Sequence, residues 1–151
     1  MSSAIATVLS KVQGFTAMNE SQLEIIAQIA HPKKSPANTQ IVHEGDQSDE
    51  LYIIAAGQVS IDFQSYRGNT INICRIGEQQ LFGELAYLDH QPRSASATTT
   101  IESKIFILKR EDLDKCFNDN PDIGYLFMHD LAQLVTRKLR YTNLALKDKA
   151  A

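Results

Sequence analysis

The spacing of apolar and polar residues divides the chain into three zones, and the first, residues 3–31, has the helical period. Gly14 and Pro32 end its two helical stretches. Asn19 and Gln22 have the spacing of a capping box, which predicts that the second helix begins there. The apolar positions of the two helices are Ile5, Val8, Leu9 and Val12, then Leu23, Ile25, Ile26 and Ile29.

From residue 37 to residue 109 the period changes to two, as in strands that bury one face. Turn-forming pairs such as Gly45-Asp46 and Gly77-Glu78 separate short runs rich in β-branched side chains. Many short strands at this density predict an antiparallel roll or barrel, and no alternation of strands with helices supports a doubly wound sheet. The predicted strands are residues 39–42, 51–55, 59–63, 70–76, 95–101 and 105–108.

The last zone, residues 110–151, returns to the helical period. A short helix is predicted at 110–117, and Asn120 followed by Pro121 predicts the start of a long helix that runs to about Lys147. This helix carries two apolar stripes. One suits packing on the roll and consists of Ile123, Phe127, Leu131 and Leu134. The other has heptad spacing and consists of Met128, Ala132, Val135, Leu139, Thr142 and Leu146.

We predict that the heptad stripe meets another helix, most simply the 121–147 helix of a second copy. The alternative, that both stripes belong to the core, stays open at this point. The helix also carries a basic cluster, which we interpret as its solvated face rather than as a contact to DNA. Its members are Arg137, Lys138, Arg140, Lys147 and Lys149.

Composition narrows the class of protein. A chain of 151 residues with 43% apolar content predicts one domain over 1–151, divided into a helical part (1–36), a β-roll (37–109) and C-terminal helices (110–151). A net charge of −3 argues against a protein that coats nucleic acid. Without a long apolar run or a signal-peptide pattern, we expect a cytoplasmic, bacterial protein that does not bind membranes.

Cysteine and histidine usage points away from metal or disulfide chemistry. Cys74 and Cys116 are too few and too far apart for a disulfide framework, and we interpret them as reduced thiols. The four histidines are scattered without ligand spacing, so no metal site is predicted. No arrangement of a nucleophile with a base stands out, so we do not expect an enzyme.

The most informative stretch is residues 82–95. Gly83 permits a ligand to approach the backbone closely, and the helical turn that follows it offers free N–H groups to an anion. Arg93 lies nine residues after Glu84 and is expected to reach back into the same hollow. An arginine fork with bare amides suits a phosphate of one negative charge, and a carboxylate beside it suits a sugar hydroxyl. These residues therefore predict a sugar phosphate site.

Gly-Glu-Leu-Ala, a short spacer and then Pro-Arg-x-Ala resemble the phosphate-binding cassette of cyclic-nucleotide-binding domains. These domains occur in bacterial catabolite-activator-type regulators, kinase regulatory subunits and gated channels. Residues 44–59 are similar to a hairpin of the same family, and the resemblance covers nearly the whole chain. It implies an α+β fold: an antiparallel β-roll with N-terminal helices, a short cassette helix within 82–95 and a long C-terminal helix.

The resemblance implies roles for the cassette residues. Arg93 would pair with the cyclic phosphate, and Glu84 would accept a hydrogen bond from the ribose 2′-hydroxyl. Backbone amides after Gly83 would hold the exocyclic oxygens. The residues that supply these further donors are Leu85, Ala86 and Ser94. The alternative for Glu84 and Arg93 is a plain buried ion pair.

The base contacts are implied by position in the family pattern. Ile73 and Cys74 precede the cassette and are expected to face the purine, although both suit an ordinary core. Thr142 and Asn143 stand where side chains of the bacterial regulators reach the base from two subunits; the alternative is that Thr142 only sets the register of the seam. We favour cAMP over cGMP, a choice that the sequence does not settle.

The resulting hypothesis is a non-enzymatic cyclic nucleotide receptor without a further cofactor. It would signal to a second copy or to an unknown effector protein by repositioning its C-terminal helix. One alternative is the sensor half of a transcriptional regulator whose DNA-binding domain is absent from this chain. Another is a degenerate β-roll that binds no nucleotide and serves as an interaction module.

Overall fold

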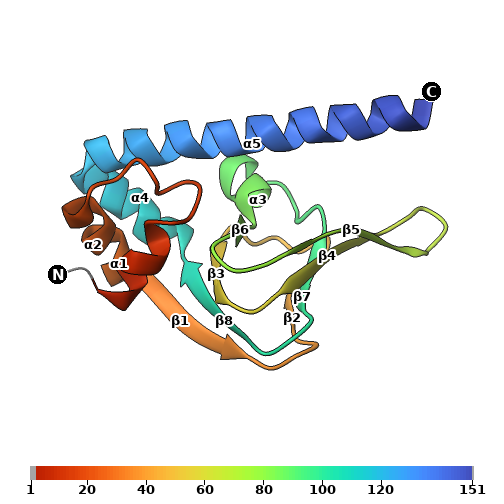
Figure 1. Ribbon diagram of the computed structural model, residues 1–151, viewed down its shortest axis with the longest axis horizontal. Coiled ribbons are helices and arrows are strands. Elements are labelled where there is room, and N and C mark those ends of the chain that lie inside the picture. The colour runs from red at the N-terminus through yellow and green to blue at the C-terminus, as the bar shows by residue number, and fades with distance from the viewer. Residues whose placement is uncertain (1–2, 151) are drawn as a thin grey trace.

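The computed structural model describes residues 3–150, which form an α+β fold with two antiparallel sheets of four strands each. The N-terminal helices and α4 lie at one end of the roll, and α5 runs along its top (Figure 1). The helices are α1 (Ala4–Leu9), α2 (Glu20–Ile29), α3 (Glu84–Asp89), α4 (Arg110–Asp119) and α5 (Pro121–Ala150). The strands are β1 (Ala30–Ser35), β2 (Gln40–Val42), β3 (Leu51–Ala56), β4 (Val59–Gln64), β5 (Thr70–Ile76), β6 (Leu81–Phe82), β7 (Ser96–Thr99) and β8 (Ser103–Leu108).

The two sheets have the strand orders β1-β8-β3-β6 and β2-β7-β4-β5. Strand β3 shows how the period of two builds the core. Leu51 and Ile53 face the helices, in a cluster that also contains Phe127, whereas Tyr52 and Ile54 face the space between the sheets. Strand β3 is therefore buried on both faces, between the helices on one side and the second sheet on the other.

The six predicted strand ranges include neither β1 nor the two-residue β6, and the ends of several elements differ from those predicted. Residues 30–35 form β1, although Pro32 was expected only to end a helix; as an edge strand that pairs with β8 alone, β1 tolerates a residue without an N–H. Helix α1 ends at Leu9, and Val12 lies in turns. The predicted strand 95–101 is observed only at Ser96–Thr99, whereas β8 begins before residue 105.

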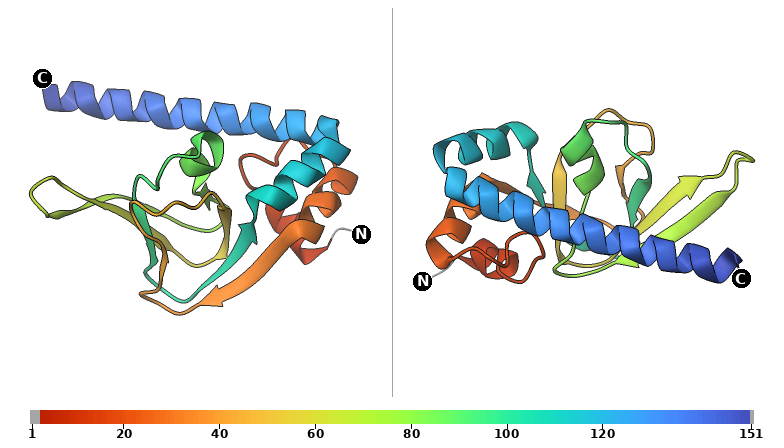
Figure 2. Two further views of the ribbon diagram at one scale, coloured as in Figure 1. Left: turned by 180° about the vertical axis from the view of Figure 1, so that it is seen from behind. Right: turned by 90° about the horizontal axis from the view of Figure 1, so that it is seen from above.

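Helix α5 divides into an anchored part and a free part. The stripe predicted to pack on the roll is buried or half-buried. The heptad stripe is mostly exposed, with Leu139 at 61% and Leu146 at 59%, so the reading that both stripes are core is wrong. Every residue from 139 to 150 is exposed. Figures 1 and 2 show this part of α5 extending past α3 on the side of the β4–β5 hairpin.

Candidate functional site

Gly83 sets the geometry of the site, because no other residue fits there. Its φ of 88° lies in the left-handed region. A Cβ at this position would meet Arg93 Nη1 and the Glu50 carbonyl oxygen at 2.9 Å each. The close approach of the Gly83 backbone to Arg93 therefore depends on glycine both for conformation and for space.

Arg93 is held by neutral oxygen atoms on three sides. It is 4% exposed and lies in the loop before β7. Nε donates to Ser48 Oγ (2.9 Å), Nη1 to the Gly83 carbonyl (3.1 Å) and Nη2 to the Glu50 carbonyl (2.9 Å). A guanidinium has five N–H groups, so one N–H remains on each terminal nitrogen. The guanidinium also lies 5.6 Å from the ring centroid of Tyr52.

Arg93 and Glu84 do not form the ion pair that was the alternative interpretation. Among residues 3–150, no carboxylate is paired with Arg93. A cation buried without a counter-ion is costly, because carbonyl and hydroxyl dipoles replace only part of its hydration. The N–H groups of Arg93 that these three hydrogen bonds leave over thus suit an anion such as a phosphate or a carboxylate.

Glu84 is the first residue of α3 and is 6% exposed. Its Oε1 accepts a hydrogen bond from Lys138 Nζ of α5 at 2.5 Å. The first backbone hydrogen bond at this end of α3 runs from Tyr87 N to Gly83 O (3.3 Å). The amides of Leu85 and Ala86 precede it and have no acceptor within the helix. Carboxylate, amides and guanidinium thus come from consecutive parts of one cassette.

Helix α4 holds α3 from its other end. Arg110 Nη1 donates to the Tyr87 carbonyl, and its guanidinium lies 5.0 Å from the Tyr87 ring centroid. The Tyr87 hydroxyl is buried and has no hydrogen-bond partner among the described residues. Burial raises the pKa of this hydroxyl, and Asp114 adds to the shift. The cassette helix is therefore fixed by cations from α4 and α5.

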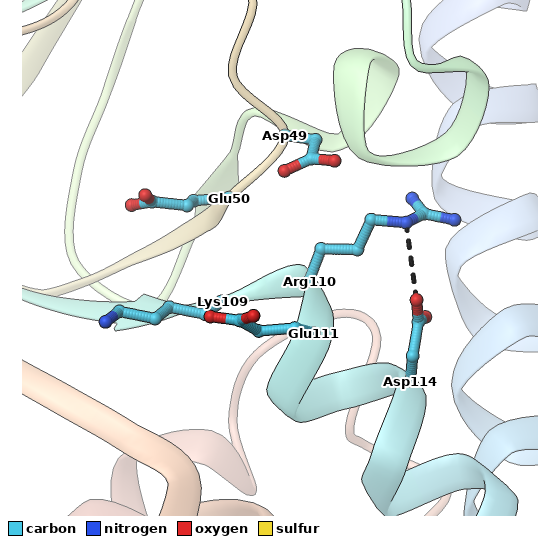
Figure 3. Close-up of a pocket in the computed structure, with 6 residues that line it drawn as sticks. All are labelled: Asp49, Glu50, Lys109, Arg110, Glu111 and Asp114. Atoms are coloured by element: carbon cyan, nitrogen blue, oxygen red, sulfur yellow. Dashed lines mark ion pairs between the residues drawn. The ribbon is translucent and has the colours of Figure 1, made fainter.

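A hollow lined by charged side chains lies between the segment before β3 and the start of α4 (Figure 3). It has a volume of about 390 Å³, and the Nε of Arg110 lies 3.5 Å from Asp114 Oδ2 in it. Four acidic and two basic side chains line it, so it does not suit a phosphate. They are Asp49, Glu50, Lys109, Arg110, Glu111 and Asp114.

Before the cassette, a β-bulge interrupts the pairing of β5 with β4. Ile61 pairs with Cys74 and packs in the cluster between the sheets. The pairing then shifts to Asp62 with Asn72, whose side chains are joined by a 2.8 Å hydrogen bond. Ile73 is the extra residue, and a bulge of this kind breaks the alternation of side chains between Asn72 and Cys74. Both Ile73 and Cys74 are exposed.

The predicted base contacts on α5 are not brought to the cassette. Thr142 and Asn143 are exposed, and Thr142 Oγ1 donates to the Lys138 carbonyl one turn earlier. Cys74 does lie in this region: its pKa is raised by burial, and the charges of Lys138 and Glu84 both act on it. The structure thus brings β5, α3 and the middle of α5 together, and leaves the end of α5 outside.

Among the predicted cassette residues, Leu85 is 48% exposed and Ser94 is exposed. Two polar residues at the site were not predicted. Ser48 lies in the segment 44–59 and was given no role, and Lys138 was assigned to a solvated helix face. Lys138 does lie on an exposed helix face, but its ammonium group also reaches the buried Glu84, which was not predicted. Each of these two contacts joins residues more than forty positions apart, and no local pattern in the sequence indicates such a contact.

A model of the cyclic nucleotide-binding domain family matches residues 32–120, and the chain belongs to this family. The cAMP-activated global transcriptional regulator of CRP type from Mycobacterium tuberculosis is 30% identical over 141 residues, which are 93% of this chain and 61% of that protein. The cyclic AMP receptor protein of Thermus thermophilus is 33% identical over 111 residues, 74% of this chain and 50% of that protein.

Solved structures agree with the fold. The catabolite activator protein of Thermus thermophilus superposes with a TM-score of 0.81 and 28% identity, over 91% of this chain and 63% of that one. A cyclic nucleotide-binding domain from Methylobacillus flagellatus gives a TM-score of 0.86 at 23% identity, over 96% of this chain and 82% of that one. The predicted β-roll fold is thereby confirmed. The chain spans less than two thirds of the length of the curated relatives named above.

Proposed function

We propose that this chain is a non-enzymatic receptor for a cyclic nucleotide, with cAMP as its ligand rather than cGMP. The observation that carries the proposal is the buried guanidinium of Arg93, which has no carboxylate partner among residues 3–150 and two unused N–H groups. A cyclic phosphodiester carries one negative charge and offers two oxygens to such a fork. The relatives named as cAMP-activated proteins support the choice of nucleotide.

The remaining contacts follow from this placement of the phosphate. The Leu85 and Ala86 amides and Ser94 donate to the exocyclic oxygens, since these groups stand at the start of α3 and beside Arg93. Glu84 accepts a hydrogen bond from the ribose 2′-hydroxyl. The purine lies against the inner face of β5, where Ile73 and Cys74 offer an apolar surface.

The signal is a shift in the position of α5. Lys138 already joins α5 to the cassette, so a ligand bound at Glu84 favours the state in which the helix is docked. Contacts of the base with Thr142 and Asn143 would extend this docking along the free part of α5. An effector protein in the cytoplasm then reads the altered helix surface.

The free part of α5 also supports a homodimer. Its heptad stripe is exposed, and an apolar seam of this spacing pairs two helices. A parallel pair would bring Asn143 of each copy near the nucleotide of the other.

No helix among residues 3–150 is both long and apolar enough to cross a membrane.

A second candidate is the sensor half of a transcriptional regulator. The observation that favours it is the length of the relatives, of which this chain spans 61% and 50%. Nucleotide binding is common to both candidates, and a DNA-binding segment in the parent gene would decide between them. This chain by itself is not expected to shift DNA in an electrophoretic assay.

Calorimetric titration with cAMP and cGMP in parallel tests the receptor proposal. Wild-type protein is expected to bind cAMP more tightly than cGMP, and Arg93→Leu to bind at least about 100-fold more weakly, because charge-assisted hydrogen bonds are lost. Arg67→Leu, in the exposed turn between β4 and β5, is the matched control and should bind as wild type. Absence of binding to folded wild-type protein would instead favour the interaction module without a nucleotide.

A further inference from the structure

Ser48 holds Arg93 through a neutral hydroxyl group. Its Oγ accepts a hydrogen bond from Arg93 Nε at 2.9 Å. The two chain segments are also joined by backbone hydrogen bonds of 2.9 Å each, from Gly45 N to Arg93 O and from Arg93 N to Asp46 O. Ser48 is half-buried and lines a hollow of about 210 Å³. The contact is therefore fixed by the backbone on both sides, and there is room beside the hydroxyl.

The two residues that follow this serine in the chain are acidic, yet neither carboxylate is paired with Arg93. Asp49 Oδ2 lies 3.6 Å from His90 Nδ1, at the end of α3. The Glu50 carboxylate accepts a hydrogen bond from the Tyr52 hydroxyl at 3.3 Å, whereas its backbone carbonyl accepts from Arg93. Figure 3 shows the two carboxylates extending in different directions. Arg93 is thus held by a hydroxyl although two carboxylates lie next to it in the sequence.

We propose that Ser48 is a positioning residue for Arg93 and sets the charge that the site offers to a ligand. The inference rests on the proposed function of the site. A hydroxyl accepts the hydrogen bond from Nε without a charge of its own, so the guanidinium keeps its positive charge for a bound anion. A carboxylate in the same place would neutralise the guanidinium from within the protein, and a phosphate would have to compete with it. The neutral acceptor at residue 48 therefore keeps the site open for a phosphodiester.

The same reasoning predicts opposite effects on ligand binding and on stability. Arg93 is buried without a carboxylate partner among residues 3–150, which is costly while no ligand is bound. An internal carboxylate at residue 48 would remove this cost, and the hollow beside Ser48 has room for the longer side chain. Such a change would stabilise the free protein and close the site. A residue that only fills space would not move the two quantities in opposite directions.

The test measures cAMP affinity by calorimetry and the unfolding midpoint Tm without nucleotide. Ser48→Asp is expected to bind at least about 100-fold more weakly than wild type and to unfold roughly 3 °C higher, because Arg93 gains an internal counter-ion. Ser48→Ala should bind about tenfold more weakly, since the guanidinium loses the acceptor that orients it. Ser48→Thr keeps the hydroxyl and should restore the affinity. Gln47→Glu is the matched control: it adds the same charge at the neighbouring exposed residue and should change the affinity by less than about threefold.

The outcomes separate this inference from the proposed function. If wild type binds cAMP and Ser48→Asp binds within about threefold of it, the role of Ser48 is wrong and the receptor proposal survives. An equal loss in Gln47→Glu, or a loss in Ser48→Asp with a lower Tm, would also overturn that role, because general charge or damage to the fold would then explain the effect.

If folded wild-type protein binds no cAMP, the receptor proposal fails. A higher Tm in Ser48→Asp would then still support its pairing with Arg93, and an unchanged or lower Tm would overturn it. Circular dichroism checks that each variant is folded. Should Ser48→Asp not fold, the comparison of Ser48→Ala with Ser48→Thr decides, and equal affinities in these two variants would contradict the role of the hydroxyl.

Discussion

The phosphate end and the base end of the candidate site differ in how completely one chain builds them. At the phosphate end, Arg93 is buried and its guanidinium is fixed by Ser48 and two backbone carbonyls. At the base end, Ile73 is 53% exposed and the facing part of α5 is free. Contacts within this chain hold the side chains of the phosphate end in place. The residues of the base end are exposed to solvent and have few such contacts.

This difference suggests a division of labour. The phosphate end loses little conformational entropy when a ligand binds, because its side chains are already held in place. On the proposed function, it would therefore supply affinity for any nucleotide with a cyclic phosphate. If the proposed function holds, the open end is the part that the ligand and a second copy would order, and it would supply selectivity and the signal. Helix α5 has the same division along its length, with Asp130 anchored in the core and residues 139–150 exposed.

The largest effect is expected from Gly83→Ala. The new Cβ would meet Arg93 Nη1 and the Glu50 carbonyl, so the fork must move and affinity for cAMP should fall by roughly 100-fold. Calorimetry measures this loss. Gly68→Ala is a matched control, because Gly68 has a similar φ of 85° but nothing within 4 Å of its Cβ position. It should lose about 1 kcal/mol of stability and no affinity. Equal losses of affinity in both variants would contradict a preorganised phosphate end.

The anchored part of α5 is tested by Asp130→Ala. This change leaves the Gly14 amide and the Thr16 hydroxyl without their acceptor in a buried place, so the free energy of unfolding should fall by about 3 kcal/mol. Chemical denaturation measures it, with Asp148→Ala on the exposed end of α5 as the control. A loss below 1 kcal/mol would show that this contact does not anchor the helix.

The base end is tested by alkylation of Cys74. Burial raises the pKa of this thiol above that of a free cysteine, so less of it is thiolate at pH 8, and labelling should speed up as the pH rises. Saturating cAMP should slow the labelling about tenfold by covering β5. Cys116 is buried and serves as the internal control in mass spectrometry. Labelling of Cys74 that ignores the nucleotide would place the base elsewhere.

The smallest effect is expected from Asn143→Ala. The residue is exposed, so its contact with the base depends on a second copy, and cAMP affinity should fall only about threefold. The loss should disappear in Leu139→Glu, which places a charge in the exposed heptad stripe and should yield monomers by sedimentation. A threefold loss that persists in the monomeric variant would assign Asn143 to the site of its own chain.

Much of the fold could be predicted because it depends on local patterns. The alternation along β3, the capping box at Asn19 and the proline start of α5 are each contained in a few consecutive residues. The cassette could be predicted for the same reason, since Gly83, Glu84 and Arg93 lie within one short segment. Strand β1 was missed because Pro32 was interpreted only as the end of a helix, whereas it is the third residue of an edge strand.

The sequence by itself determined the order of the elements, the roll and the chemistry of the cassette, because turn residues, apolar period and a glycine in the left-handed region act over short distances. Only the tertiary structure decided that Arg93 is paired with Ser48 and carbonyls, that Glu84 is paired with Lys138, and that a bulge at Ile73 interrupts the pairing of β4 with β5. These outcomes depend on which surfaces meet after the chain has folded, and contacts between distant positions leave no period in the sequence.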